Sequence, residues 1–92
     1  MIQTFRCPDT AALFAGQRVA GFVNFEKVAM RKLAMLNRAT TLGDLRIPPN
    51  NRLEQLVGDR AGQHSIRIND QFRVCFRFDQ GSAFDVEIVD YH

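Results

Sequence analysis

The fold of this chain is decided by residues 63–78, QHSIRINDQFRVCFRF, which have the pattern of two strands joined by a short turn. Apolar residues occupy every second position on each side of the turn, and arginines recur between them. Successive side chains of a strand point to opposite faces of a sheet. The pattern therefore predicts one face that packs on a core and one face that gathers guanidinium groups.

The same alternation predicts how the two strands pair. If their apolar residues share a face, a three-residue loop at 69–71 places Ile66 opposite Val74 and Arg67 opposite Arg73. Like charges directly opposite each other destabilise a sheet. We therefore expect either a carboxylate or a bound anion beside these arginines.

A second hairpin extends the sheet toward the C-terminus. A loop at 80–82 is expected to place Phe78 opposite Phe84 and Arg77 opposite Asp85, which would form an ion pair.

Two interpretations of the arginine-bearing face remain open. The first is a solvated charged face in which Glu87, diagonal to Arg73, is an internal partner. The second is a phosphate-binding site, because guanidinium groups match phosphate oxygens and do not lose their charge.

Composition predicts a single domain over residues 1–92. The chain is 46% hydrophobic and 24% charged, which suffices for one core. No apolar run approaches 18 residues, and the start of the chain lacks the layout of a signal peptide, so no membrane contact and a cytoplasmic location are expected. The net charge of +2 and the pI near 8.8 permit a nucleic-acid partner without requiring one.

The cysteines and histidines are too few and too scattered for a metal site. Cys7 and Cys75 have no CxxC spacing, and the two histidines are His64 and His92. Both cysteines are expected to be free thiols, and no metal or other cofactor is predicted. His64 shares the parity of Ile66, so we expect it on the apolar side.

The N-terminal half is predicted to be mainly helical. A short strand at 2–6 is followed by a brief helix capped by Asp9 or Thr10 and closed by Gly16. Helical spacing of apolar residues then predicts a long helix over 24–39, whose basic residues are expected to be solvated.

The linker that follows contains Pro48 and Pro49 and is expected to be extended, ahead of a short strand at 52–57 and a turn at 58–62. The order of elements predicts an α+β fold with two N-terminal helices packed on one face of a small, mostly antiparallel sheet.

Several segments together resemble one known family. They are Met1-Ile2-x-x-Phe5, residues 31–36, Asp44-Leu45, residues 58–67, residues 71–76 and the ending Asp90-Tyr91-His92. Through these segments the chain resembles the HigB toxins of the RelE/ParE superfamily. Because the segments are spread from one end of the chain to the other, the resemblance covers essentially its whole length. The resemblance implies a RelE-like fold and a toxin of a type II toxin–antitoxin system.

The resemblance also implies an activity and partners. The expected protein is a ribosome-dependent mRNA endoribonuclease that works without metal in the A site and is neutralised by a HigA-type helix-turn-helix antitoxin. Operator DNA would be contacted only indirectly, through the antitoxin complex. In such cleavage the ribose 2′-hydroxyl attacks the adjacent phosphate, so the enzyme must stabilise extra negative charge and move two protons.

The resemblance assigns roles to particular residues. Arg73 matches the catalytic arginine of the family, and its C-terminal motif matches Asp90, Tyr91 and His92. His92 suits proton transfer at neutral pH, and the ring of Tyr91 could stack on a base. Many relatives carry a histidine and a lysine just before the Gly-Asp pair, whereas this chain has Glu54 and Val57 there.

Glu54 is therefore a candidate base, and Arg60, Arg67 and Arg77 are candidate RNA-binding residues. Two alternative functions stay open on the same fold: a non-catalytic module that binds RNA or a protein partner, and a ParE-like inhibitor of DNA gyrase.

Overall fold

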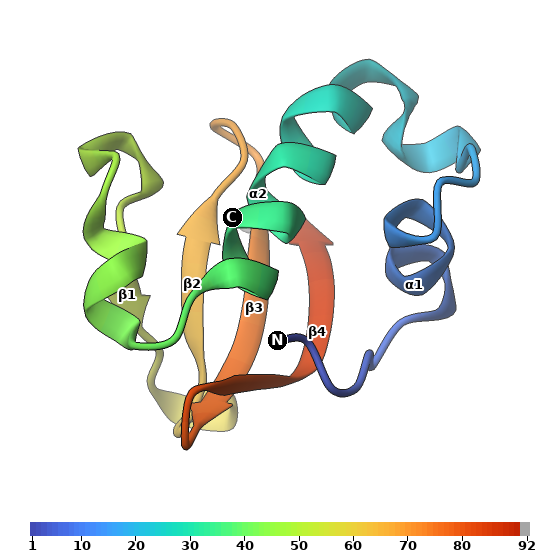
Figure 1. The fold of residues 1–92 in the computed structure, drawn as a ribbon. Helices are drawn as coiled ribbons and strands as arrows, with labels where there is room; N and C mark the ends of the chain where they lie inside the picture. Colours follow the sequence, from blue (N-terminus) through green and yellow to red (C-terminus); the bar gives the residue numbers. More distant parts are fainter. Residues whose placement is uncertain (91–92) are drawn as a thin grey trace.

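The computed structural model describes residues 1–90 and has an α+β fold in which helices cover one face of an antiparallel sheet (Figure 1). In chain order, with η for 3₁₀ helices, the elements are α1 (Pro8–Phe14), η1 (Ala20–Phe25), α2 (Glu26–Arg38), η2 (Leu42–Arg46), η3 (Pro49–Asn51), β1 (Glu54–Gln55), η4 (Gly58–Arg60), β2 (His64–Arg67), β3 (Phe72–Asp79) and β4 (Ser82–Asp90). The four strands lie in sequence order, β1-β2-β3-β4. The predicted fold class is confirmed.

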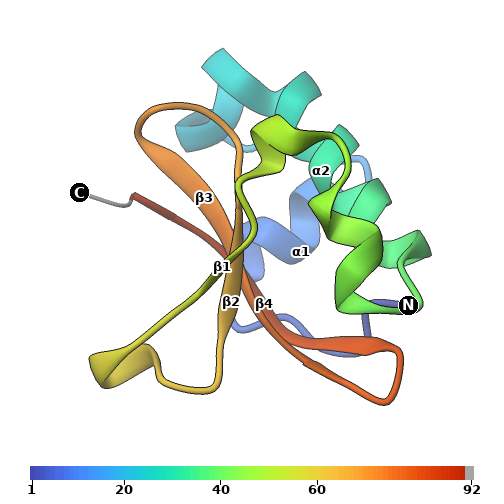
Figure 2. The same cartoon turned by 90° about the vertical axis from the view of Figure 1, so that its left-hand side faces the viewer.

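The core lies between the sheet and α2. In Figure 2 both α1 and α2 lie on one side of the sheet, and α2 contacts β3 and β4. Buried apolar residues of the strands include Ile66, Val74, Phe76, Val86 and Ile88. They all follow the parity expected from the sequence, because one face of each strand needs an apolar partner.

The amphipathic pattern of α2 explains how the helix covers the sheet. Ala29, Leu33 and Leu36 are fully buried, and their spacing of four and three residues places them on one stripe. The helix begins at Glu26, after the 3₁₀ segment η1, which is slightly later than the sequence indicates. The region described contains no helix long and apolar enough to cross a membrane.

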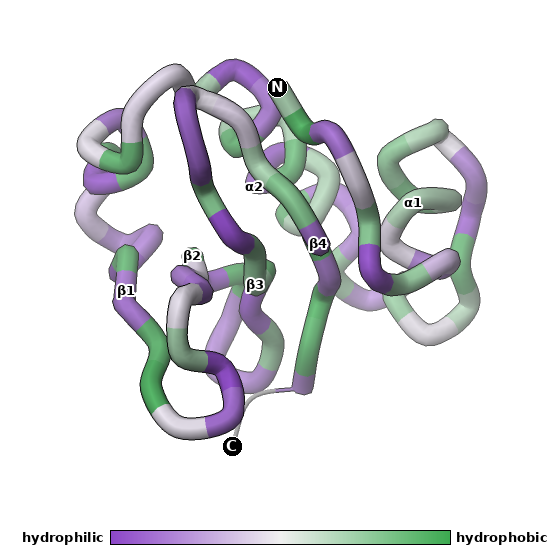
Figure 3. Tube along the Cα trace, turned by 90° about the horizontal axis from the view of Figure 1, so that it is seen from below, coloured by the Kyte–Doolittle hydropathy of each residue, from purple (hydrophilic) through white to green (hydrophobic). Residues whose placement is uncertain are grey.

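The expected first strand is reduced to two isolated parallel bridges. Ile2 pairs with Ala83 and Phe5 with Val86, and Figure 3 shows the first residues running beside β4 before they turn into α1. The amide of Ile2 also donates to Asn37 Oδ1 at the end of α2, at 2.9 Å. This segment thus fastens β4 to the helical layer.

The start of α1 differs from the prediction. Cys7 is the N-cap, without a side-chain hydrogen bond, and Pro8 occupies the first helical turn, where its missing N–H costs nothing. Thr10 does not cap the helix; its buried hydroxyl accepts a hydrogen bond from the amide of Ile88 at 3.0 Å. A residue expected at a helix end therefore joins α1 to β4.

The second hairpin follows the predicted register near the sheet centre and departs from it near the turn. Val74 lies opposite Ile88 as expected, but beyond a bulge Arg77 pairs with Phe84 and Phe78 with Ala83. The bulge residue is Asp85, which has a positive φ of 54° and whose amide donates to Thr4 Oγ1 at 2.8 Å. One extra residue on β4 shortens the turn to two residues.

That turn consists of Gln80 and Gly81, with φ values of 48° and 80°. Such a pair of left-handed residues suits the twist of a tight hairpin. A Cβ atom at Gly81 would lie 3.2 Å from the carbonyl oxygen of Thr40, just after α2. The turn therefore packs against the helical layer and favours glycine for both reasons.

Candidate active site on the arginine face

The strands carry a row of polar residues on the sheet face opposite the helices. We call this the arginine face. Its strand residues are Ser65, Arg67, Arg73, Cys75 and Arg77, and Arg60 of η4 is counted with it because it pairs with Glu87 of β4. Arg67 lies opposite Arg73 across the β2–β3 pair, as the sequence predicted.

Arg73 is built into this face and is only 8% exposed. Its Nε donates to Ser65 Oγ at 2.7 Å, and one terminal nitrogen donates to the carbonyl of Arg52 at 2.5 Å. Arg52 has a left-handed backbone, with a φ of 46°. These contacts fix the direction of the guanidinium group, so a solvated charged face does not describe this position.

Each arginine of this face has a carboxylate within ion-pair distance. The pairs are Arg60–Glu87 at 2.8 Å, Arg67–Asp70, Arg73–Glu54 at 4.0 Å and Arg77–Asp85 at 3.5 Å. The sequence left a choice between a carboxylate and an anion as the answer to the opposed arginines, and in the free protein carboxylates provide it.

The pairs differ in how easily a phosphate could replace the carboxylate. The side chain of Glu87 is only 16% exposed, which makes its pair with Arg60 part of the packed structure. The side chains of Glu54 and Asp70 are 50% and 99% exposed. The side chain of Asp85 is likewise 44% exposed. Exposed ion pairs contribute little free energy, so a phosphate would replace Glu54, Asp70 or Asp85 more readily than Glu87.

The partners of the arginines were only partly predictable. The Arg77–Asp85 ion pair is present even though a bulge shifts the register. Glu87, expected beside Arg73, forms its 2.8 Å ion pair with Arg60. The reason is that the side chain of Arg60, in η4 after β1, reaches Glu87 on β4, which strand parity alone does not reveal.

Glu54 lies in β1 directly opposite Ser65, which places it on the arginine face beside Arg73. The two-residue strand β1 is shorter than the expected strand at 52–57. It is nevertheless sufficient to bring the candidate base and the candidate catalytic arginine together.

The C-terminal end of β4 passes the same position. Val89 pairs with Arg73, and the exposed Asp90, opposite Phe72, accepts a hydrogen bond from the side-chain amide of Gln71 at 3.0 Å. Tyr91 and His92, which complete the predicted motif, lie outside the described residues.

A buried lysine supports the loop behind Arg73 and was missed from the sequence. Lys32, expected to be solvated, is 6% exposed, and its ammonium donates to Asn51 Oδ1 at 2.5 Å. The fully buried Asn51 donates in turn to the carbonyl of Leu45 at 3.1 Å. Burial, and then the charges of Arg31 and Arg67, lower the pKa of Lys32 from its ordinary value of 10.5.

The thiol of Cys75 lies between Arg73 and Arg77 on the strand but is fully buried. Burial raises the pKa of Cys75 above its ordinary value of 9.0, and Glu87 adds to the rise against the opposing effect of Arg60 and Arg73. The thiol is therefore protonated at neutral pH and unsuited to nucleophilic attack.

His64 faces the apolar side, as expected, and its ring is stacked on the ring of Phe76, with 6.3 Å between the two ring centroids. Within residues 1–90 no three His, Cys, Asp or Glu side chains are grouped to hold a metal ion.

Two known proteins are similar in sequence to about two thirds of this chain. Toxin HigB-1 of Vibrio cholerae is 44% identical over 62 residues, which are 67% of this chain and 65% of that protein. Endoribonuclease HigB of Proteus vulgaris is 34% identical over 61 residues, 66% of this chain and 65% of that protein. The aligned segments thus span somewhat less than two thirds of these relatives.

The fold has solved counterparts. It matches a chain of the heterotetrameric YoeB-YefM toxin–antitoxin complex of Staphylococcus aureus with a TM-score of 0.58 and 18% identity. The match covers 100% of this chain and 98% of the Staphylococcus aureus chain. The family model of the RelE-like toxin HigB of type II toxin–antitoxin systems matches residues 18–92. The chain therefore belongs to the HigB-like toxins, the RelE-like toxins of type II toxin–antitoxin systems.

Proposed function

We propose that this chain is a cytoplasmic, ribosome-dependent endoribonuclease that cuts mRNA in the ribosomal A site. We further propose that a HigA-type helix-turn-helix antitoxin neutralises it. The observation that carries the proposal is the fixed guanidinium of Arg73, which lies opposite Arg67 and beside Glu54. Family membership and the similarity to an endoribonuclease of Proteus vulgaris support it.

The proposed reaction is an attack of the ribose 2′-oxygen on the adjacent phosphorus. The bond to the 5′-oxygen breaks, which leaves a 2′,3′-cyclic phosphate and a 5′-hydroxyl. Negative charge on the phosphate rises in the transition state, where preorganised donors are most effective. Arg73, already oriented by Ser65, would bind that charge by exchanging Glu54 for the phosphate, and Arg67 would hold a neighbouring oxygen.

Two protons must move during this reaction. The displaced Glu54 would then lie close to the 2′-hydroxyl as base, and His92 would protonate the leaving 5′-oxygen. Tyr91 would stack on a base, with Asp90 orienting the C-terminal motif. Arg60 and Arg77 would contact flanking phosphates. Imidazole is the group best suited to donate a proton near neutral pH.

Pulse expression of the chain without its antitoxin, followed by mapping of new mRNA 5′ ends, tests this function. We expect ends phased with codons and a requirement for ribosomes. Growth arrest with intact mRNA would indicate a binding module instead, and broken DNA with an SOS response would indicate a gyrase inhibitor.

The role of His92 has a separate test. Deletion of His92 and the variant His92→Gln should both slow single-turnover cleavage on programmed ribosomes about 100-fold while ribosome binding is kept, since this is the usual scale for a lost general acid or base. Near-normal cleavage by both variants would move the search for the proton carrier to Glu54, Asp90 and Tyr91.

A further inference from the structure

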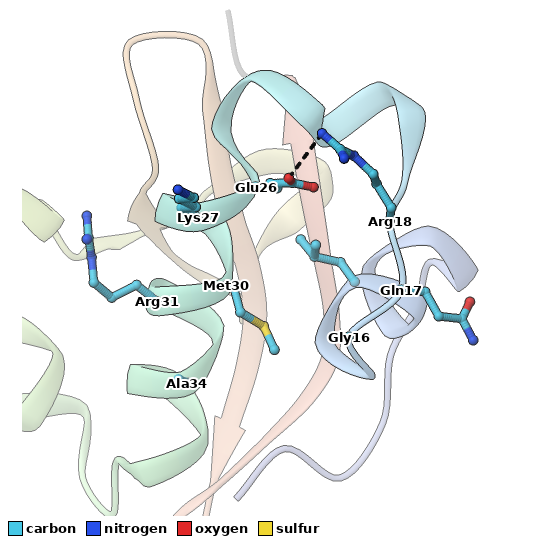
Figure 4. Close-up of a pocket in the computed structure, with 9 residues that line it drawn as sticks. Gly16, Gln17, Arg18, Glu26, Lys27, Met30, Arg31 and Ala34 are labelled. Atoms are coloured by element: carbon cyan, nitrogen blue, oxygen red, sulfur yellow. Dashed lines mark ion pairs between the residues drawn. The ribbon is translucent and has the colours of Figure 1, made fainter.

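A groove of about 520 Å³ lies on the helical side of the molecule, between the end of α1 and the exposed side of α2 (Figure 4). We call it the α1–α2 groove. Its apolar part is formed by Leu13, which is 4% exposed, and by the partly buried Met30 and Ala34. Methionine adapts its shape to different partners and is common at binding surfaces.

The rim of the groove is basic. Lys27 and Arg31 are exposed and lie one turn apart on α2, where two like charges weaken a helix slightly. Neither has an ion-pair partner among residues 1–90. On the opposite rim Arg18 pairs with Glu26 at 3.6 Å, the contact drawn in Figure 4.

This rim contrasts with the arginine face, where every arginine already has a carboxylate within 4.0 Å. The groove combines an apolar floor with unpaired positive charge. It is lined by the helical layer, which Figure 2 shows on one side of the sheet, whereas Arg73 belongs to the arginine face. These properties complement an amphipathic helix whose apolar residues are flanked by Asp or Glu. Nucleic acid would satisfy the charges but not the apolar floor.

We propose that the α1–α2 groove binds an acidic amphipathic helix of the antitoxin. An apolar side chain of that helix would enter between Leu13 and Met30, and its carboxylates would face Lys27 and Arg31. This inference rests on the proposed function, because it takes the antitoxin of that function as the partner.

The test measures the dissociation constant of the purified chain with the antitoxin encoded beside its gene, by isothermal titration calorimetry. Reversing both rim charges, Lys27→Glu with Arg31→Glu, should weaken binding about 100-fold, since like charges placed together in an interface are strongly unfavourable. Ala34→Glu should weaken it comparably by blocking the floor. The matched control is Arg38→Glu, an exposed position of α2 outside the groove, which should change binding less than about 3-fold.

The charge-reversed chain should still cut mRNA at the wild-type rate, so cells that express it should die even when the antitoxin is present. Equal binding by the charge-reversed and wild-type chains would overturn the groove and leave the proposed function intact. A control variant weakened as much as the double variant would also overturn it. If the wild-type chain cuts mRNA in codon phase but does not bind the antitoxin, the partner and the groove both fail while the endoribonuclease stands.

Discussion

Arg73 and Arg77 project from the same face of β3, yet the two ends of that strand hold their guanidinium groups in opposite ways. Arg73 is 8% exposed and donates to a hydroxyl and to a backbone carbonyl. The side chain of Arg77 is 56% exposed and has a single 3.5 Å ion pair with Asp85. The same residue type is thus part of the packed structure at one end and a surface charge at the other.

The difference shows what turns a row of arginines into a candidate site. Ordering a long side chain costs conformational entropy, and at Arg73 the folded protein has already met that cost through Ser65 and the carbonyl of Arg52. A phosphate bound there would meet a guanidinium group that needs little reorganisation. At Arg77 the same ligand would have to order the side chain itself.

The largest expected effect comes from Arg73→Ala. Single-turnover cleavage on programmed ribosomes should fall at least about 100-fold. The free energy of unfolding should also fall, by about 1–3 kcal/mol, because Ser65 Oγ and the carbonyl of Arg52 lose their hydrogen-bond donor. Arg73→Lys should recover part of the stability but little of the activity, since an ammonium cannot form the guanidinium fork. Full activity in either variant would refute the assignment of Arg73.

Ser65→Ala tests whether the fixed orientation of Arg73 matters. The variant keeps the charge and removes the hydroxyl that accepts from Nε at 2.7 Å. We expect a loss of about 1–2 kcal/mol in stability and about tenfold in the cleavage step, with unchanged ribosome affinity. Ser82→Ala is the matched control, because Ser82 Oγ makes only an exposed 3.3 Å contact with Gln3. Equal cleavage rates for Ser65→Ala and Ser82→Ala would mean that the hydrogen bond between Ser65 and Arg73 does not contribute to catalysis.

The pH dependence of stability examines the loop behind Arg73. The folded protein lowers the pKa of Lys32, so between that pKa and 10.5 the unfolded chain binds more protons than the folded one. The burial of this charge therefore costs stability at neutral pH, and the cost declines as the pH rises toward 10.5. Denaturant titrations of wild type and Lys32→Met should show a smaller alkaline gain in the variant. Parallel pH profiles would show that Lys32 titrates normally.

Arg77→Ala should have the smallest effect. Its ion pair with Asp85 is exposed on both sides, and such pairs contribute less than about 1 kcal/mol. Cleavage should stay within about 3-fold of wild type, with any change in substrate affinity rather than in the chemical step. A loss as large as that of Arg73→Ala would remove the distinction between the two ends of β3.

The alternation of apolar and polar residues along the strands predicted the strand pairing wherever that alternation is regular. The pairing of Ile66 with Val74 and of Arg67 with Arg73 follows from alternation alone, because a slip of one residue would expose the whole apolar set. The register beyond Cys75 did not follow, because the bulge at Asp85 includes a hydrogen bond from the Asp85 amide to Thr4, which is 81 residues away in the sequence.

The candidate site was predictable in its residues and less so in its contacts. Family resemblance supplied Arg73, and parity placed it opposite Arg67. Ser65 was missed because a serine, here between His64 and Ile66, is ordinary in a strand. The burial of Lys32 was missed because its partner, Asn51, lies 19 residues away at the end of η3, a segment that was expected to be extended.

The four arginine–carboxylate pairs also have a consequence for counterion release. RNA binding normally weakens steeply with salt, because each cation that contacts a phosphate frees a condensed ion from the nucleic acid, with a logarithmic slope of about −0.7 per contact for single strands. An arginine that leaves a carboxylate to reach a phosphate also exposes that carboxylate, which then attracts a cation from solution. The affinity of the arginine face for RNA should therefore decline less steeply with salt than its four guanidinium groups alone would imply.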